Sequence, residues 1–136
     1  MSVEGAKKEN LSDFMGQVFE EMCRQYLFLP EIYQALPFPI GEIGRWWGNN
    51  PRARRQEEID LMSVSDDKAL FCDCKWRNEK VGLQVWEILM ERGELFSYPD
   101  KYYYIFSKSG FDDTMISLAN NRKNVTLIDF EDMCSV

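Results

Sequence analysis

The chain contains no histidine, and this absence narrows the chemistry open to it. Ser-His and Cys-His catalytic groups, histidine-ligated metals and zincin motifs are all excluded. The four cysteines include no Cys-x-x-Cys pair, which argues against a zinc ribbon. A GxxxxGK[ST] phosphate-binding loop is also missing, so this chain is not itself an ATPase. Any catalysis must therefore use carboxylates, lysine, tyrosine, serine or a metal ion.

Long hydrophobic runs, internal repeats and Gly/Ser linkers are absent as well. No apolar stretch is long enough to cross a bilayer, and the first ten residues do not have the shape of a signal peptide. Of the 136 residues, 45% are hydrophobic and 14% aromatic, which favours a folded core over disorder. We therefore expect one cytoplasmic domain over 1–136, with no membrane partner.

Positive charge is scarce, because the net charge is −7. That total argues against nonspecific nucleic-acid binding. One segment, 45–55, is nevertheless basic and free of acids, and it carries Arg45, Arg52, Arg54 and Arg55. These arginines either contact phosphates beside an acidic site or form a solvated loop, and the sequence leaves both interpretations open.

Hydrophobic periodicity and turn residues predict the order αβββαβαβ. The first helix should begin after Asn10 as its N-cap, with an apolar stripe of Leu11, Met15, Val18, Phe19, Met22 and Tyr26. After a turn over 31–39, the predicted strands are 40–47, 58–64, 69–76, 102–107 and 125–128, and the predicted later helices are 80–96 and 112–120.

Acidic residues lie inside two of these strands, which a four-residue turn should join into a hairpin. Strand alternation places Glu58 and Asp60 on one face, with Ile59 and Leu61 on the other. The same rule places Asp73 with Lys75, opposite Cys72 and Cys74. If the polar faces align, three carboxylates and an amine converge, which is a suitable site for a divalent metal that activates water. A buried salt bridge is the competing interpretation.

This order, with Asp60 on one strand and Asp73-x-Lys75 on the next, resembles the PD-(D/E)xK nuclease superfamily. The resemblance implies an α/β fold with a restriction-endonuclease-like αβββαβ core, in which helices flank a mixed central sheet. It also implies a glutamate on the first helix, matched by Glu20, and a polar residue on the next helix, matched by Gln84. The plainer interpretations are a solvent-exposed acid and an ordinary helix-edge residue.

A closer resemblance is to a domain of unknown function found at the C-terminus of archaeal and bacterial AAA-type ATPases. The matching blocks are Gly16 to Glu20, Tyr26-Leu27, Ile43 to Gly48, Glu57 to Asp60 and Cys74 to Trp76. The chain departs from that pattern at Asp73, where we expect glutamate. The resemblance implies an ATPase partner, either in the same chain or in another one.

The resemblance also implies residue roles in a Mg²⁺- or Mn²⁺-dependent DNA endonuclease. Asp60, Asp73, the backbone carbonyl of Cys74 and Glu20 would hold the metal, and Glu58 would lie in an outer shell. Lys75 would stabilise the attacking hydroxide or the phosphate, while Gln84 and the four arginines would contact nucleic acid. Trp46 and Trp47 point to opposite sheet faces, so at least one belongs to the core, and the other is available for base stacking. The alternative is an inactive nuclease-like module that binds nucleic acid or mediates assembly for a partner ATPase. A homodimer is a further option.

Overall fold

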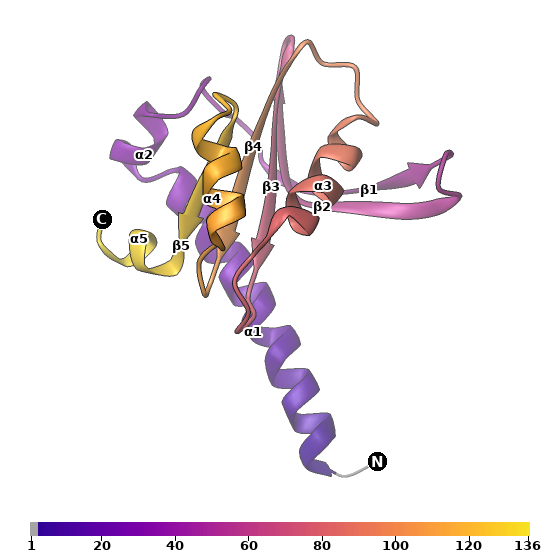
Figure 1. The fold of residues 1–136 in the computed structure, drawn as a ribbon, viewed down its shortest axis with the longest axis vertical. Helices are drawn as coiled ribbons and strands as arrows, with labels where there is room; N and C mark the ends of the chain where they lie inside the picture. Colours follow the sequence, from indigo (N-terminus) through magenta and orange to yellow (C-terminus); the bar gives the residue numbers. More distant parts are fainter. Residues whose placement is uncertain (1–2) are drawn as a thin grey trace.

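A five-stranded mixed sheet with helices on both faces forms the body of the protein (Figure 1). The structure is a computed structural model that describes residues 3–136, with side chains described from residue 10 on. Residues 1 and 2 of the predicted domain 1–136 lie outside this range. The elements are α1 (Val3–Leu27), α2 (Pro30–Gln34), β1 (Gly44–Asn50), β2 (Arg55–Ser65), β3 (Lys68–Lys75), α3 (Leu83–Gly93), β4 (Asp100–Ser107), α4 (Asp113–Asn120), β5 (Val125–Asp129) and α5 (Phe130–Cys134).

The strands follow the order β1-β2-β3-β4-β5 across the sheet. β1, β2 and β3 pair antiparallel, whereas β3, β4 and β5 pair parallel. This arrangement confirms the predicted mixed α/β fold with its αβββαβ core. Among the described residues, no helix has both the length and the apolar content that crossing a bilayer requires.

Two hydrophobic cores lie on opposite faces of the sheet. α1 packs on one face, where Phe19, Cys23 and Leu27 are buried against β3 and β4. α3 and α4 cover the other face, where Leu89 and Met115 are buried. The central strands β3 and β4 are therefore covered on both sides, which explains why they consist of continuous rather than alternating apolar residues.

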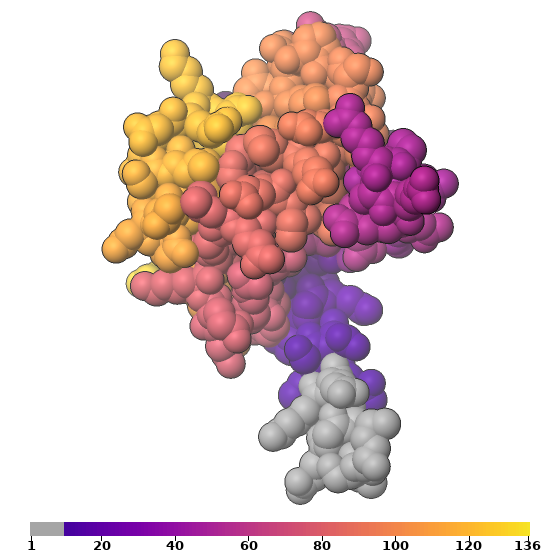
Figure 2. Space-filling model, turned by 45° about the vertical axis from the view of Figure 1, so that its right-hand side comes forward, coloured from indigo at the N-terminus to yellow at the C-terminus, as the bar shows by residue number. Residues whose placement is uncertain are grey.

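α1 extends well beyond the sheet (Figures 1 and 2). Because it begins at Val3, Asn10 lies inside the helix, and the prediction of Asn10 as the N-cap is wrong. The predicted apolar stripe is also only partly buried: Phe19 and Tyr26 belong to the core, but Leu11 is 61% exposed and Met22 36% exposed. The first described turns of α1 project past the strands in Figure 1.

β1 lies further along the sequence than the predicted strand 40–47. Ile40 is buried, but the backbone pairing with β2 begins only at Gly44. Before Gly44, the Ser63 Oγ donates a hydrogen bond to the Glu42 carbonyl over 2.8 Å. At the other end, pairing continues to Asn50 opposite Arg55. The turn that follows occupies 51–54, and the Asn50 side chain accepts hydrogen bonds from two of its backbone amides at 3.1 and 3.2 Å.

A bulge interrupts the pairing of β1 with β2 between Gly44 and Trp46. Ile59 consequently packs in the core under α3, whereas Leu61 packs in the core under α1. The prediction that these two residues share one face is therefore wrong, because a bulge breaks the alternation of a regular strand. The other predicted elements are present with shifted ends. Asp112, the first residue of the predicted helix 112–120, is the N-cap of α4 and accepts a hydrogen bond from the Met115 amide.

β2 and β3 separate next to this bulge. Their ladder ends at the pair Leu61 and Cys72, whereas β3 stays paired with β4 as far as Lys75 and Ser107. Asp60 is the residue before Leu61, and Asp73 is the residue after Cys72, so each acid lies next to the last pair of the ladder. The fold therefore places both acids at the point where the two strands part.

Candidate functional site

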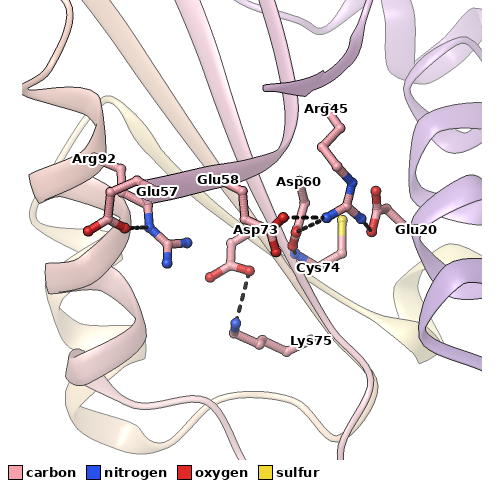
Figure 3. A network of polar contacts seen from close by, with 9 residues as sticks. All are labelled: Glu20, Arg45, Glu57, Glu58, Asp60, Asp73, Cys74, Lys75 and Arg92. Atoms are coloured by element: carbon pink, nitrogen blue, oxygen red, sulfur yellow. Dashed lines mark hydrogen bonds and ion pairs between the residues drawn. The ribbon is translucent and has the colours of Figure 1, made fainter. Parts of the chain in front are cut away.

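Asp60 and Asp73 meet between the separating strands (Figure 3). Asp73 is 4% exposed, and the Asp60 side chain is 19% exposed. The Cys74 amide donates to Asp60 Oδ2 over 2.8 Å, which fixes that carboxyl against β3. The two carboxyl groups lie close enough for the charge of Asp73 to act on Asp60. The predicted acid pair is thus brought together by the structure.

This proximity changes the acidity of Asp60. Burial raises its pKa, and the charge of Asp73 raises it further, so that the pKa reaches about 7. The hydrogen bond from the Cys74 amide acts in the opposite direction but does not compensate. In the metal-free protein, Asp60 therefore keeps its proton to a much higher pH than an ordinary aspartate does.

Lys75 lies beside the pair. Its Nζ is 3.2 Å from Asp73 Oδ1, and its side chain remains 34% exposed. The ammonium group thus neutralises part of the charge on Asp73 and is also open to a ligand. This is the placement that the Asp73-x-Lys75 alternation predicts.

A second positive charge comes from Arg45 on β1, which reaches three of the four acids in the acid cluster (Glu20, Glu58, Asp60 and Asp73; Figure 3). It forms an ion pair with Glu20 of α1 and lies 3.2 Å from Glu58 and 3.9 Å from Asp60. Burial raises the pKa of Glu20, and the charge and hydrogen bond of Arg45 offset only part of that effect. Arg45 was predicted to contact phosphate, but its guanidinium group here joins α1 to the sheet.

The chemistry of the acid cluster suits a hard divalent cation. Carboxylate oxygens are the ligands that Mg²⁺ and Mn²⁺ prefer. Burial and the neighbouring charge of Asp73 raise the pKa of Asp60, and a bound cation would offset both effects. The arrangement of these side chains fits a metal ion less well than their chemistry does. Over residues 10–136, whose side chains are described, no group of three or more Cys, Asp or Glu residues is arranged to hold a metal, and Glu20 is bound to Arg45. The Cys74 amide contacts Asp60, while a role for the Cys74 carbonyl remains a prediction.

The other predicted nucleic-acid contacts lie outside the acid cluster. Arg52 and Arg54 are exposed in the turn of the β1–β2 hairpin, which stands out from the body of the molecule (Figure 1). Gln84 is exposed in the first turn of α3, the helix that covers the sheet face opposite α1. The structure therefore does not gather these residues around the acids.

Arg55 belongs to a separate ion pair on β2. Its Nε is 2.6 Å from the buried carboxylate of Glu57, and Arg92 Nε of α3 is 2.7 Å from the other oxygen. Burial alone would raise the pKa of Glu57, but the hydrogen bonds from Arg55 and Arg92 lower it below its usual value. Sequence reasoning missed Arg92, because nothing in the sequence links two residues 35 positions apart.

Trp47 of β1 contacts two residues of the site, Glu58 and Arg45. Its Nε1 donates to Glu58 Oε2 over 3.0 Å, and Arg45 lies 5.9 Å from the centre of its ring. Trp46 is the core residue of the pair, because its ring packs at 4.9 Å on Phe96 under α3. This agrees with the prediction that at least one of the two tryptophans belongs to the core, while base stacking by the other stays a prediction.

The topology and the paired acids define a mixed α/β domain with a candidate metal site. The chain belongs to the DUF234 family, described as archaea bacterial proteins of unknown function, whose model matches residues 2–85. That match covers α1 to the start of α3, and thus the whole acid cluster with Lys75.

Part of a longer archaeal protein is similar to this chain. An uncharacterized protein of Methanocaldococcus jannaschii, MJECL04, is 33% identical over 107 residues, which are 74% of this chain and 23% of that protein. The chain therefore spans about a quarter of that relative.

Two solved structures are similar to this one. The crystal structure of a protein of unknown function, AF1548, has a TM-score of 0.50 at 13% identity, over 84% of this chain and 65% of that one, which shows a shared fold alone. The DNA modification-dependent restriction endonuclease AspBHI has a TM-score of 0.40 at 18% identity, over 87% and 33% of the two chains, which is too low to support a comparison of their sites.

Proposed function

We propose that this chain is a metal-dependent DNA nuclease domain that hydrolyses phosphodiester bonds. The observation that carries the proposal is the close approach of the Asp60 and Asp73 carboxyl groups at the point where β2 and β3 part. Two adjacent acids that stay buried with a partly exposed amine beside them form an unusual arrangement for a purely structural site. Perturbed acid pairs of this kind are typical of functional sites.

Each residue has a distinct role in this proposal. Asp60 and Asp73 would hold Mg²⁺ or Mn²⁺, with the Cys74 carbonyl and Glu20 as further ligands. A bound cation of this kind supplies Lewis acidity and favours ionisation of water. Lys75, whose ammonium lies 3.2 Å from Asp73, would stabilise negative charge that develops on the phosphate. The exposed arginines of the hairpin turn, Arg52 and Arg54, would contact the DNA backbone away from the reacting bond.

A partner ATPase is part of the proposal. In the relative from Methanocaldococcus jannaschii, most of the protein lies outside the matched segment, which leaves room there for another domain. This chain has no phosphate-binding loop of its own, so the ATPase would be a separate domain or a separate protein.

Cleavage assays test the proposal most simply. Plasmid DNA and single-stranded DNA are incubated with the protein and Mg²⁺ or Mn²⁺, and the products are followed on gels over time. We expect cleavage by the wild type and a rate roughly 10²–10³ lower for Lys75→Ala, because a preorganised positive charge is removed from the reacting phosphate.

Lys68→Ala is the matched control, since Lys68 lies on the same strand as Lys75 but pairs with Asp67 and Asp100 at its other end. Its cleavage rate should equal that of the wild type. Wild-type protein that fails to cleave either DNA with either metal would contradict the proposal, as would equal rates for the Lys75 and Lys68 variants.

Arg45 favours a second candidate function, a nuclease-like module that binds nucleic acid or mediates assembly without cleavage. Its guanidinium already provides positive charge to Glu20, Glu58 and Asp60. These three acids therefore have a positive partner without a metal ion. If this candidate holds, DNA binding persists in EDTA, while no cleavage appears with either metal.

A further inference from the structure

Trp47 is exposed to an extent that is unusual for a tryptophan in a strand. It is 65% exposed, whereas its neighbour Trp46 packs into the core under α3. Exposed surface of this size on a large aromatic side chain often marks a place where another molecule binds. Trp47 also lies on the sheet face that carries Arg45 and Glu58, next to the acid cluster.

The Trp47 ring is held in position before any ligand arrives. Its Nε1–H donates to Glu58 over 3.0 Å, and the Arg45 guanidinium lies 5.9 Å from the ring centre. Both contacts fix the orientation of the indole while most of its surface stays open. A preorganised ring loses little conformational freedom when a flat partner stacks on it.

A groove of about 570 Å³ runs between α1 and β1 and includes Trp47 in its lining. This volume is within the range of small-molecule sites and suits a single nucleotide. Gln17 and Arg24 reach the groove from α1 and offer hydrogen-bond donors. The groove includes Glu20 of the acid cluster and also Arg45, which lies 3.9 Å from Asp60, so a ligand in the groove would lie near Asp60.

The charge of the groove indicates which part of a nucleic acid it suits. Its charged residues are two acids, Glu20 and Glu21, and two arginines, Arg24 and Arg45, so their charges sum to zero. Glu21 and Arg24 already pair with each other over 2.9 Å. A neutral groove with a flat aromatic wall, donors and acceptors matches a base better than a phosphate. In a duplex, the base faces are stacked and unavailable, so the base must be unpaired.

We propose that this groove binds one unpaired base of single-stranded DNA, stacked on Trp47. The inference rests on the proposed nuclease function and deepens it, because it assigns single-stranded DNA as the preferred substrate. The sugar–phosphate next to the stacked base would then lie at Asp60 and Asp73.

Binding measured without metal tests this inference separately from cleavage. Fluorescence anisotropy of a labelled thymidine 20-mer is followed in EDTA at low salt, with a duplex of equal length in parallel. We expect Trp47→Ala to weaken single-strand binding roughly 5- to 100-fold, the range for loss of one base–aromatic stack. Trp47→Phe, which keeps a flat ring, should retain most of the affinity, and duplex affinity should be equal in all three proteins.

Val64→Ala is the control for loss of an exposed apolar side chain, since Val64 is 46% exposed near the end of β2 and does not line this groove. It should bind both DNAs as the wild type does. Equal single-strand affinities of Trp47→Ala and wild type would overturn the inference, as would a wild type that binds the duplex as tightly as the single strand. A chain that binds in this Trp47-dependent way but never cleaves would contradict the nuclease proposal and leave the base site intact.

Discussion

Two acids of β2, three positions apart, have opposite electrostatic surroundings. Glu57 lies between Arg55 and Arg92, and its pKa is lowered. Asp60 is buried against Asp73, and its pKa is raised to about 7. The first acid is therefore stable as an anion in the metal-free protein, whereas the second is not. This difference separates the ion pair of Glu57 from the acid pair that we propose as a cation site.

The raised pKa of Asp60 predicts how stability depends on pH without metal. Between the pKa of an unfolded aspartate, about 4, and the folded value of about 7, the folded state binds more protons than the unfolded state. The free energy of unfolding should therefore fall as pH rises through this window, by up to about 4 kcal/mol from this group. Urea unfolding in EDTA at pH 4 to 8 measures the slope, and Asp60→Asn should remove most of it.

Glu57→Gln is the matched control on the same strand, and the sign of its effect is opposite. Because the folded pKa of Glu57 is lowered, its ion pairs stabilise the protein above the unfolded pKa and are lost as pH falls. The substitution should lower the free energy of unfolding at pH 7 by about 2–4 kcal/mol. A pH slope in Asp60→Asn equal to that of the wild type would contradict the assignment of the slope to this acid.

At the scale of elements, α1 consists of two parts with different environments. Its second half packs on the sheet through Phe19, whose ring lies 5.2 Å from Trp76 and 6.3 Å from Phe130. Its first described turns carry the exposed side chains of Leu11 and Phe14. The second half positions Glu20 beside Arg45, so the docking of α1 is also what completes the acid cluster.

This division of α1 predicts unequal effects of two similar substitutions. Phe19→Ala should lower the free energy of unfolding by about 3–5 kcal/mol, because a fully buried ring is replaced by a cavity. Phe14→Ala, which removes a ring that is 59% exposed, should change it by less than about 0.5 kcal/mol. Chemical unfolding of the purified variants measures both values. Similar losses in the two variants would show that the first half of α1 is packed as well.

Local patterns predicted most of the elements, because apolar periodicity and turn residues act over a few positions. The hairpin between Asp60 and Asp73 is an example, since its turn at 66–67 follows from the local sequence. The errors arose where distant contacts decide the structure. The bulge opposite Asp60 moves Leu61 to the face under α1, and the ladder with β2 extends β1 to Asn50. Neither the bulge nor the longer pairing can be recognised from the residues of a single strand, because both depend on how β1 and β2 pair.

At the scale of the whole molecule, the candidate site was predictable in part. Asp60, Asp73 and Lys75 could be predicted because they are charged residues within otherwise apolar strands, a pattern that is visible over a few neighbouring positions. The role of Arg45 could not, since its contact with Glu20 joins residues 25 positions apart and exists only once α1 packs on the sheet. The same packing of α1 on the sheet forms the groove that Trp47 lines. The sequence alone did not decide which of Trp46 and Trp47 is exposed.

The central claim is that Asp60 and Asp73 together form a cation site, and titration calorimetry with Mn²⁺ tests it most directly. The wild type should bind one Mn²⁺ per chain, and Asp60→Asn and Asp73→Asn should each weaken binding by at least about tenfold, since each removes a charged ligand worth more than about 1.4 kcal/mol. Glu57→Gln, which alters an acid outside the site, should bind as the wild type does. No measurable binding by the wild type, or equal binding by the wild type and Asp60→Asn, would contradict the claim.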